Sequence, residues 1–189
     1  LLPLGGYRKS EIREIAEANG FVNAHKRDSQ DICFVPDGDY ASFIERHTGE
    51  TFPEGDFADR NGNRLGTHLG IMRYTVGQRK GLGIALGKPA FVCGKNVATN
   101  TVTLGDNDDL FSTTLTAHDV NLIACDSLDA PVRVTAKVRY GQAEQPATAR
   151  MTEEGRLCVE FDTPQRAIAS GQSVVLYDGD TVVGGGIID

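Results

Sequence analysis

The residue best suited to chemistry in this sequence is Cys33, in the stretch KRDSQDICFVPDGDY at residues 26–40. A thiolate is a nucleophile, and nearby cations together with solvent access favour its formation. A histidine, a lysine and an arginine occupy positions 25–27, and the polar run that follows could form a turn that exposes the thiol. Free cysteine is also among the most buried residue types, and Cys33 has apolar neighbours on both sides. Residue chemistry alone leaves a nucleophile and a core residue both open.

A second unusual segment, YTVGQRKGLGIALGKPA at residues 74–90, alternates glycines with polar and basic residues. It fails the phosphate-loop pattern of nucleotide-binding proteins, because Pro89 stands where a serine or threonine would hold magnesium. Backbone N–H groups in a mobile glycine-rich loop, together with arginine and lysine, suit a phosphate backbone. We therefore expect Gln78, Arg79 and Lys80 to be candidate contacts to a nucleic-acid backbone.

A third candidate is the pair Arg139 and Tyr140 in AKVRYGQ, at the end of an expected strand. An arginine can donate two hydrogen bonds to one phosphate, and an exposed aromatic ring can stack on an unpaired base. Both are typical contacts to RNA. The alternative, that both are ordinary exposed side chains without a ligand, explains the pair equally well. The four histidines and four cysteines show no metal-ligand spacing, so no metal site is predicted.

The distribution of charge supports a polyanionic partner, although the net charge of the chain is −7. Residues 60–105 contain seven basic residues and no acidic one, and residues 131–150 contain four basic residues and one acidic residue. Such polarisation indicates basic surface available to RNA. A solvated basic face without a partner is the alternative.

The totals are those of a water-soluble protein, with 40% hydrophobic and 24% charged residues among 189. No apolar run reaches the length of about 18 residues that a membrane helix requires, so no membrane partner is predicted. The opening residues lack the pattern of a secretion signal, and the cysteines contain no CxxC pair. We therefore expect a cytoplasmic protein with reduced thiols.

Two helices are expected near the start of the chain. The first covers residues 7–20, with Ser10 as its N-cap and Gly20 as its stop, and the second covers residues 39–49 and ends at Gly49. The segment that carries the candidate thiol lies between them and is expected to be a strand or an extended loop.

The remainder of the chain is expected to be β-rich. Asn61-Gly62 is a strong hairpin signal, and residues 90–106 predict two strands around a turn near Asn100. From Thr113 onward, six short β-rich runs separated by turn residues favour a small closed barrel. The predicted fold is mainly β with a short helical N-terminal piece, a small β-rich central domain and a C-terminal barrel of six or more strands. Its three parts are residues 1–50, 51–110 and 111–189.

Several segments together resemble the bacterial tRNA-specific 2-thiouridylase family. The residues that carry the resemblance are SQDICFV, GTHLGIMRYTVGQRKGLGI, KVRY, SGQSVVLYDGD and GGGII, in the order and approximate spacing of the family. The resemblance extends over essentially all of the chain. It implies an enzyme that replaces the 2-oxygen of the wobble uridine of certain tRNAs with sulfur.

The resemblance also implies a division of labour within the enzyme. Family members begin with an ATP-binding domain that carries an SGGxDS signature and the first catalytic cysteine, and neither occurs in this sequence. The chain is therefore expected to be the central and C-terminal parts, with the last helix of the catalytic domain at its start. ATP with magnesium would be bound by the missing N-terminal domain, and no cofactor is expected in this chain.

Site residues carried over from the family are few. Cys33 in DICF matches the cysteine that carries the persulfide, whose outer sulfur is transferred to C2 of the ATP-activated uridine before the other cysteine closes a disulfide with Cys33. Arg139, Tyr140 and Gln172 match tRNA contacts of the family, whereas the three later cysteines match no motif. The implied partners are tRNA and a sulfur-donor protein, and the isolated chain is expected to be inactive.

Two rival functions belong to other classes. One is a non-catalytic RNA-binding β-barrel module, which would lack an SGGxDS motif upstream of Leu1. The other is a thiol-dependent redox protein, which would need a resolving cysteine close to Cys33.

Overall fold

The computed structural model describes residues 3–26, 35 and 38–189. The chain forms two units, Leu1–Gly49 and Glu50–Asp189. Both α-helices belong to the first unit, and all strands of the described residues belong to the second. The predicted division of the second unit at residue 110 stays a prediction.

The first helix, α1 (Lys9–Ala18), lies within the predicted residues 7–20. The prediction that Ser10 is the N-cap is wrong, since the N-cap is Arg8 and Ser10 lies inside the first turn. The reason is Glu11, whose carboxylate accepts a hydrogen bond from the Arg8 backbone N–H at 2.6 Å and so satisfies a free donor of the helix start. Gly20 follows the helix with φ of 71°, which confirms the predicted stop.

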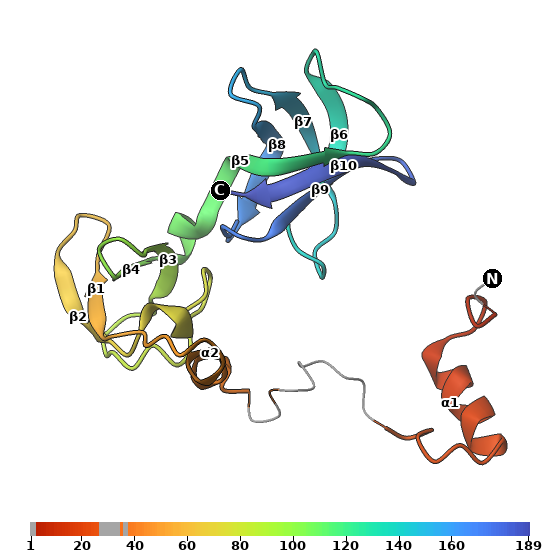
Figure 1. Cartoon of the computed structure of the whole chain (residues 1–189), viewed down its shortest axis with the longest axis horizontal. Helices are drawn as coiled ribbons and strands as arrows, with labels where there is room; N and C mark the ends of the chain where they lie inside the picture. Colours follow the sequence, from red (N-terminus) through yellow and green to blue (C-terminus); the bar gives the residue numbers. More distant parts are fainter. Residues whose placement is uncertain (1–2, 27–34, 36–37) are drawn as a thin grey trace. The chain divides into compact units, whose positions relative to one another are not determined.

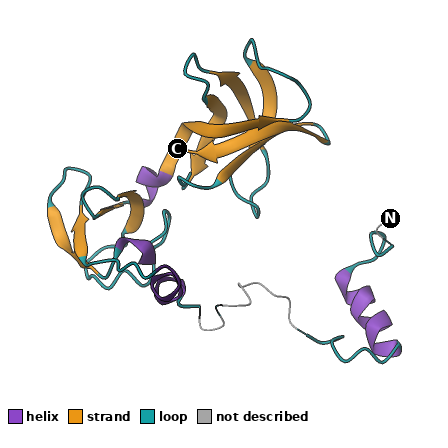
Figure 2. Cartoon of the chain, in the orientation of Figure 1, coloured by secondary structure: helices purple, strands orange, loops and turns teal. Residues whose placement is uncertain are grey.

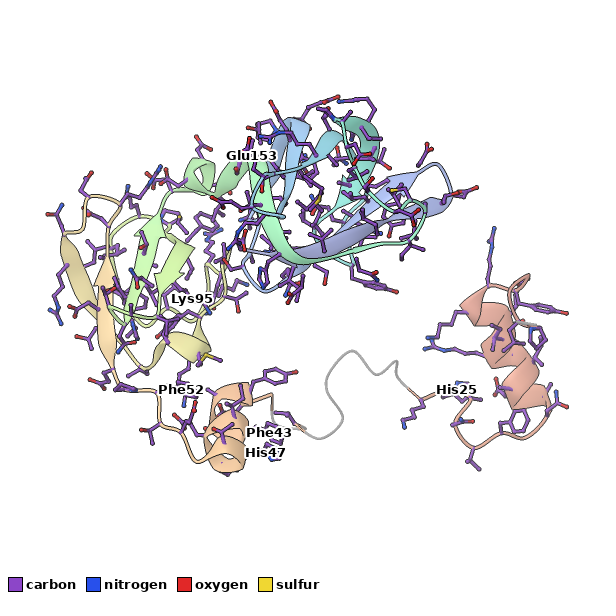
Figure 3. All side chains as sticks on the ribbon, turned by 45° about the horizontal axis from the view of Figure 1, so that its top comes forward. His25, Phe43, His47, Phe52, Lys95 and Glu153 are labelled. Atoms are coloured by element: carbon purple, nitrogen blue, oxygen red, sulfur yellow. The ribbon has the colours of Figure 1, made fainter. Side chains whose placement is uncertain are left out.

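The second helix, α2 (Tyr40–Thr48), lies within the predicted residues 39–49. Asp39 caps it by accepting a hydrogen bond from the Ser42 backbone N–H at 3.1 Å, and Gly49 ends it in the left-handed conformation. Figure 3 labels Phe43 and His47 on this helix, where one turn of spacing stacks their rings with centroids 5.7 Å apart.

The second unit begins with a four-stranded sheet of order β2-β1-β4-β3. Strands are orange in Figure 2. Its strands are β1 (Gly55–Ala58), β2 (Arg64–His68), β3 (Phe91–Asn96) and β4 (Thr101–Gly105). The hairpins β1–β2 and β3–β4 are antiparallel and confirm the turns predicted at Asn61-Gly62 and Asn100. The central pair, β1 with β4, is parallel and joins the two hairpins.

The core of this sheet also fixes the glycine-rich segment, which follows the 3-10 helix η1 (Ile71–Arg73). Tyr74 and Leu82 are buried against the sheet residues Phe57, Val92 and Val102. Apolar side chains therefore hold the segment to the sheet at two points, and Arg79 and Lys80 lie between these points in the sequence.

A second 3-10 helix, η2 (Asn107–Leu110), leads into a closed barrel of order β10-β5-β8-β7-β6-β9. All its strand pairs are antiparallel, and β5 lies beside β10 in Figure 1. The strands are β5 (Phe111–Leu122), β6 (Val132–Lys137), β7 (Gln145–Met151), β8 (Leu157–Arg166), β9 (Ser173–Asp178) and β10 (Thr181–Ile188).

The barrel interior is filled by alternate residues of each strand, as a small barrel requires. Small residues are frequent among its fully buried positions, which include Ala117, Ala136, Ala147, Ala149, Val159 and Val174. The predicted mainly-β fold with a short helical piece and a six-stranded barrel is confirmed. Among the described residues, no helix has both the length and the apolar character needed to cross a membrane.

Candidate nucleic-acid interface

Three of the residues expected to contact RNA, Arg139, Tyr140 and Gln172, lie next to the paired strands β6 and β9 of the barrel. Along β6 and its continuation, burial alternates, so Val134, Ala136 and Val138 point inward while the residues between them stay half-exposed. The strand β9 alternates in the same way. In the antiparallel register Lys137 pairs with Val175, which sets the two outer faces side by side.

A cavity of about 370 Å³ lies on this outer face. It brings together all three residues that were predicted to contact tRNA, although they come from two separate loops. The cavity is lined by Lys137, Arg139, Tyr140, Gln172, Ser173, Val175 and Tyr177. Among these described lining residues two are basic and none is acidic, which suits an anionic ligand.

Tyr140 and Gln172 are presented by turns whose backbones are fixed. Tyr140 lies in the turn after β6, closed by a hydrogen bond from the Gln142 N–H to the Arg139 carbonyl at 3.2 Å, and its side chain is 100% exposed. Gln172 is held to the last strand, where its carbonyl accepts a hydrogen bond from the Ile188 N–H at 2.8 Å. An exposed ring and an exposed amide on fixed backbones are available for stacking and for hydrogen bonds to a base edge.

Arg139 has a different environment from the other lining residues, because its guanidinium is partly used inside the protein. Its Nη2 donates to the carbonyls of Ala167 at 2.6 Å and Val76 at 3.3 Å. Its Nε is buried and has no hydrogen-bond partner among the described residues. The guanidinium therefore lines the cavity and at the same time contacts the segment before Gly77.

Sequence reasoning missed Lys137 and Tyr177. The available signal was the period of two along a strand, which places Lys137 on the same face as Arg139. Tyr177 required knowledge that β9 pairs with β6, where Tyr177 lies opposite Thr135. That pairing joins strands far apart in the sequence and was not predicted.

Hydrogen bonds hold the start of the glycine-rich segment in place, although the sequence predicted a mobile loop. The Gly77 N–H donates to the Val92 carbonyl at 2.8 Å, and the Val92 N–H donates to the Gln78 carbonyl at 2.9 Å. The Gln78 side chain accepts from the Thr75 N–H at 3.0 Å and donates to the Lys80 carbonyl at 3.0 Å, so its amide holds the turn together. Arg79 and Lys80 are exposed, and no ion pair in the described part of the chain includes either.

Another cavity, of about 360 Å³, lies beside the four-stranded sheet, and its apolar lining residues are Leu65, Leu86, Ala90 and Leu104. Its cations are matched by carboxylates: Lys88 bonds Asp106 at 3.0 Å, and Arg60 bonds Asp109. Hydrogen bonds from the Asp106 backbone and from Arg60 lower the pKa of the Asp109 carboxyl. Because these charges are paired, this cavity suits a polyanion less well than the cavity on the barrel.

Cys33 lies outside the residues that the structure describes, and its predicted role stays a prediction. Cys93, Cys125 and Cys158 are free cysteines with half-buried side chains. Burial and the neighbouring Asp109 carboxylate raise the pKa of the Cys93 thiol, which makes it a poor nucleophile. The described residues contain no cysteine pair, so the expected disulfide is not supported.

The buried histidine of this unit serves the fold. His68 accepts a hydrogen bond from the Gly70 N–H at Nδ1, so its Nε2 carries the proton and donates to the Asn100 carbonyl at 3.1 Å. Its ring packs edge-on against Phe57. Residues 3–26, 35 and 38–189 contain no group of three or more side chains suited to hold a metal ion.

Models of three protein families match successive parts of the chain. Residues 1–37 match the tRNA methyl transferase HUP domain, and residues 41–106 match the tRNA methyl transferase PRC-barrel domain. Residues 112–188 match the aminomethyltransferase beta-barrel domain. The barrel and its cavity therefore belong to the third of these domains.

Curated relatives match along the whole chain. The tRNA-specific 2-thiouridylase MnmA of Clostridioides difficile is 53% identical over 189 residues, which are 100% of this chain and 52% of the relative. The MnmA proteins of Acetivibrio thermocellus and Lachnoclostridium phytofermentans are 53% and 51% identical over 188 residues, which cover 52% and 53% of their lengths. The chain thus spans about half the length of these relatives. It is a homologue of the MnmA tRNA-specific 2-thiouridylases that covers their C-terminal half.

Proposed function

We propose that this chain binds tRNA through the cavity over β6 and β9 and supplies the persulfide cysteine of a tRNA-uridine 2-sulfurtransferase. The observation that carries the proposal is the cavity itself, which gathers Arg139, Tyr140 and Gln172 on one basic surface. Kinship with proteins named tRNA-specific 2-thiouridylase supports tRNA as the ligand.

Each residue around the cavity has a separate task in this proposal. Lys137 and the outward part of the Arg139 guanidinium attract a phosphate, which fixes the position of the RNA. The Tyr140 ring stacks on an unpaired base, and the Gln172 amide bonds the edge of that base. Unpaired bases occur in the loops of tRNA, so a loop is the part of the substrate that this surface fits.

The glycine-rich segment provides a second contact. Arg79 and Lys80 are exposed cations that bind the tRNA backbone in this proposal. Gln78 was predicted to share this task, and its side-chain bonds to the turn suggest that it contributes by holding Arg79 and Lys80 in place.

In the proposed reaction, ATP with magnesium activates the 2-oxygen of the wobble uridine, and Cys33 provides the sulfur. The ionised outer sulfur of the Cys33 persulfide attacks C2, and the activated oxygen leaves as AMP. A second thiol then attacks Cys33 Sγ and breaks its bond to the transferred sulfur, which stays on C2 as the thiocarbonyl. Exchange of the resulting disulfide with a thiol reductant returns Cys33 to the free thiol. A sulfur-donor protein recharges Cys33. ATP belongs to the HUP domain in this proposal, and only residues 1–37 of this chain match that domain. We place the reaction in the cytoplasm, where thiols stay reduced.

Binding of tRNA is tested by fluorescence anisotropy with the 189-residue chain and a labelled tRNA transcript that carries a wobble uridine. The affinity should fall linearly with salt on logarithmic axes, and Lys137→Ala should lower that slope by about one unit because one phosphate contact is lost. Unchanged affinity between low and high salt would contradict a phosphate-binding surface.

Catalysis is tested by incubating the chain with the same transcript, ATP, magnesium and a sulfur donor. Nucleoside mass spectrometry should detect no 2-thiouridine, because the SGGxDS signature of the ATP site is not among these residues. Robust formation of 2-thiouridine would refute the proposed division of labour between the two halves of the enzyme.

A further inference from the structure

Arg139 joins two parts of the second unit that are distant in the sequence. Its Nη2 donates to the Ala167 carbonyl, just after β8, and to the Val76 carbonyl, near the start of the glycine-rich segment. A guanidinium is suited to this task, because several donors in a rigid plane can serve two carbonyls and a ligand at once. A lysine would offer a single ammonium in place of this fork.

Gly77 shows how closely the segment approaches the barrel at this point. Its φ is 90°, and a Cβ added to it would come within 2.9 Å of the Ala167 Cβ. Both the close contact and the positive φ would strain a side chain here. The backbone of the segment is thus pressed against the same residue whose carbonyl Arg139 bonds.

From this contact a short path leads to the exposed cations. The Gly77 N–H and the Gln78 carbonyl bond the backbone of Val92 in β3, and the Gln78 side chain bonds the Lys80 carbonyl. A shift of Val76 and Gly77 would therefore disturb the turn that presents Arg79 and Lys80.

We propose that Arg139 is a positioning residue, which holds the glycine-rich segment against the barrel and so couples the cavity to Arg79 and Lys80. A phosphate in the cavity and the carbonyl of Val76 bond the same guanidinium. The cavity and the segment then bind one tRNA as a single surface. This coupling rests on the proposed tRNA-binding function, whereas the positioning itself does not.

Positioning is tested without RNA by hydrogen–deuterium exchange. In Arg139→Lys, the peptide that covers residues 76–80 should exchange about tenfold faster, since charge-assisted hydrogen bonds to two carbonyls are lost or weakened. The peptide of β7 should keep its protection, which shows that the barrel remains folded. Gly77→Ala should produce the same local increase with Arg139 intact, and Lys137→Ala, which removes a cavity charge, should leave it unchanged. Exchange of residues 76–80 within about twofold of the wild type in Arg139→Lys would overturn the proposal.

Coupling is tested by a double-mutant cycle of tRNA binding with the labelled transcript. Arg139→Lys should weaken binding about fivefold in the wild-type background and less than about twofold when Arg79 and Lys80 are already alanine. Equal losses in both backgrounds, or no loss in either, would overturn coupling. If the wild-type chain binds no tRNA, the proposed function fails, and the exchange experiment still decides whether Arg139 positions the segment.

Discussion

Replacing Tyr140 by alanine separates RNA binding from folding more cleanly than other substitutions in the cavity. The Tyr140 side chain is 100% exposed, so its removal leaves no internal void and costs no buried apolar contact. Surface substitutions of this kind change the free energy of unfolding by less than about 0.5 kcal/mol. We therefore expect the melting temperature of Tyr140→Ala to equal that of the wild type within about 2 °C.

The effect on RNA should be much larger than the effect on folding. A base stacked on an aromatic side chain contributes about 1–3 kcal/mol to binding by alanine substitution. Since about 1.4 kcal/mol corresponds to a factor of ten, the Kd for the tRNA transcript should rise about 5- to 150-fold. Tyr140→Phe keeps the ring and should stay within about threefold of the wild type.

Fluorescence anisotropy at one fixed salt concentration measures these affinities, and a thermal melt of each variant checks folding. Ile123→Ala is a matched control, because Ile123 is an exposed side chain of the same barrel, 66% accessible, that does not line the cavity. Binding of Tyr140→Ala within about twofold of the wild type would refute stacking at this position.

Two further predictions concern the thiols and the acid stability of the barrel. Treatment with inorganic polysulfide should add the mass of one sulfur atom to the tryptic peptide of Cys33. The peptide of Cys93 should stay unmodified, because burial raises the pKa of the Cys93 thiol. Preferential modification of Cys93 would contradict this assignment. Hydrogen bonds from the Thr116 side chain and from Arg156 lower the pKa of the Asp189 carboxyl to about 2, below the ordinary value of 3.8. The ionised carboxylate therefore stabilises the barrel above about pH 4, and this contribution is lost as the pH falls through about 2. Thermal melts between pH 4 and pH 2 should show a smaller loss of stability in Asp189→Asn than in the wild type, and equal losses would count against this ion pair.

Local turn and cap chemistry was sufficient to predict most elements of this fold. Asn61-Gly62 and Asn100 placed both hairpins, and Gly49 placed the end of α2, because each signal acts within a few residues. The wrong N-cap at Ser10 has the same local origin, since Glu11 offered a competing partner to the backbone of Arg8. The strands β1 and β4 belong to two different hairpins. No local signal in the sequence specifies that they pair with each other in parallel.

The candidate site shows the same limit. Motifs pointed to Arg139, Tyr140 and Gln172, yet only the pairing of β6 with β9 reveals that they share a cavity with Tyr177. The bonds from Arg139 to the carbonyls of Val76 and Ala167 were equally beyond the sequence, because they require two distant backbone segments to meet. A residue type predicts which ligands a side chain can bind, and the tertiary contacts decide which of them it reaches.

The central claim is that tRNA occupies the cavity over β6 and β9, and ultraviolet cross-linking followed by mass spectrometry tests it most directly. The 189-residue chain bound to the tRNA transcript should yield cross-linked nucleotides on peptides that contain Tyr140 or Tyr177, and an excess of unlabelled transcript should abolish them. Cross-links confined to other regions, such as the cavity between Arg60 and Lys88 in the four-stranded sheet, would contradict the account.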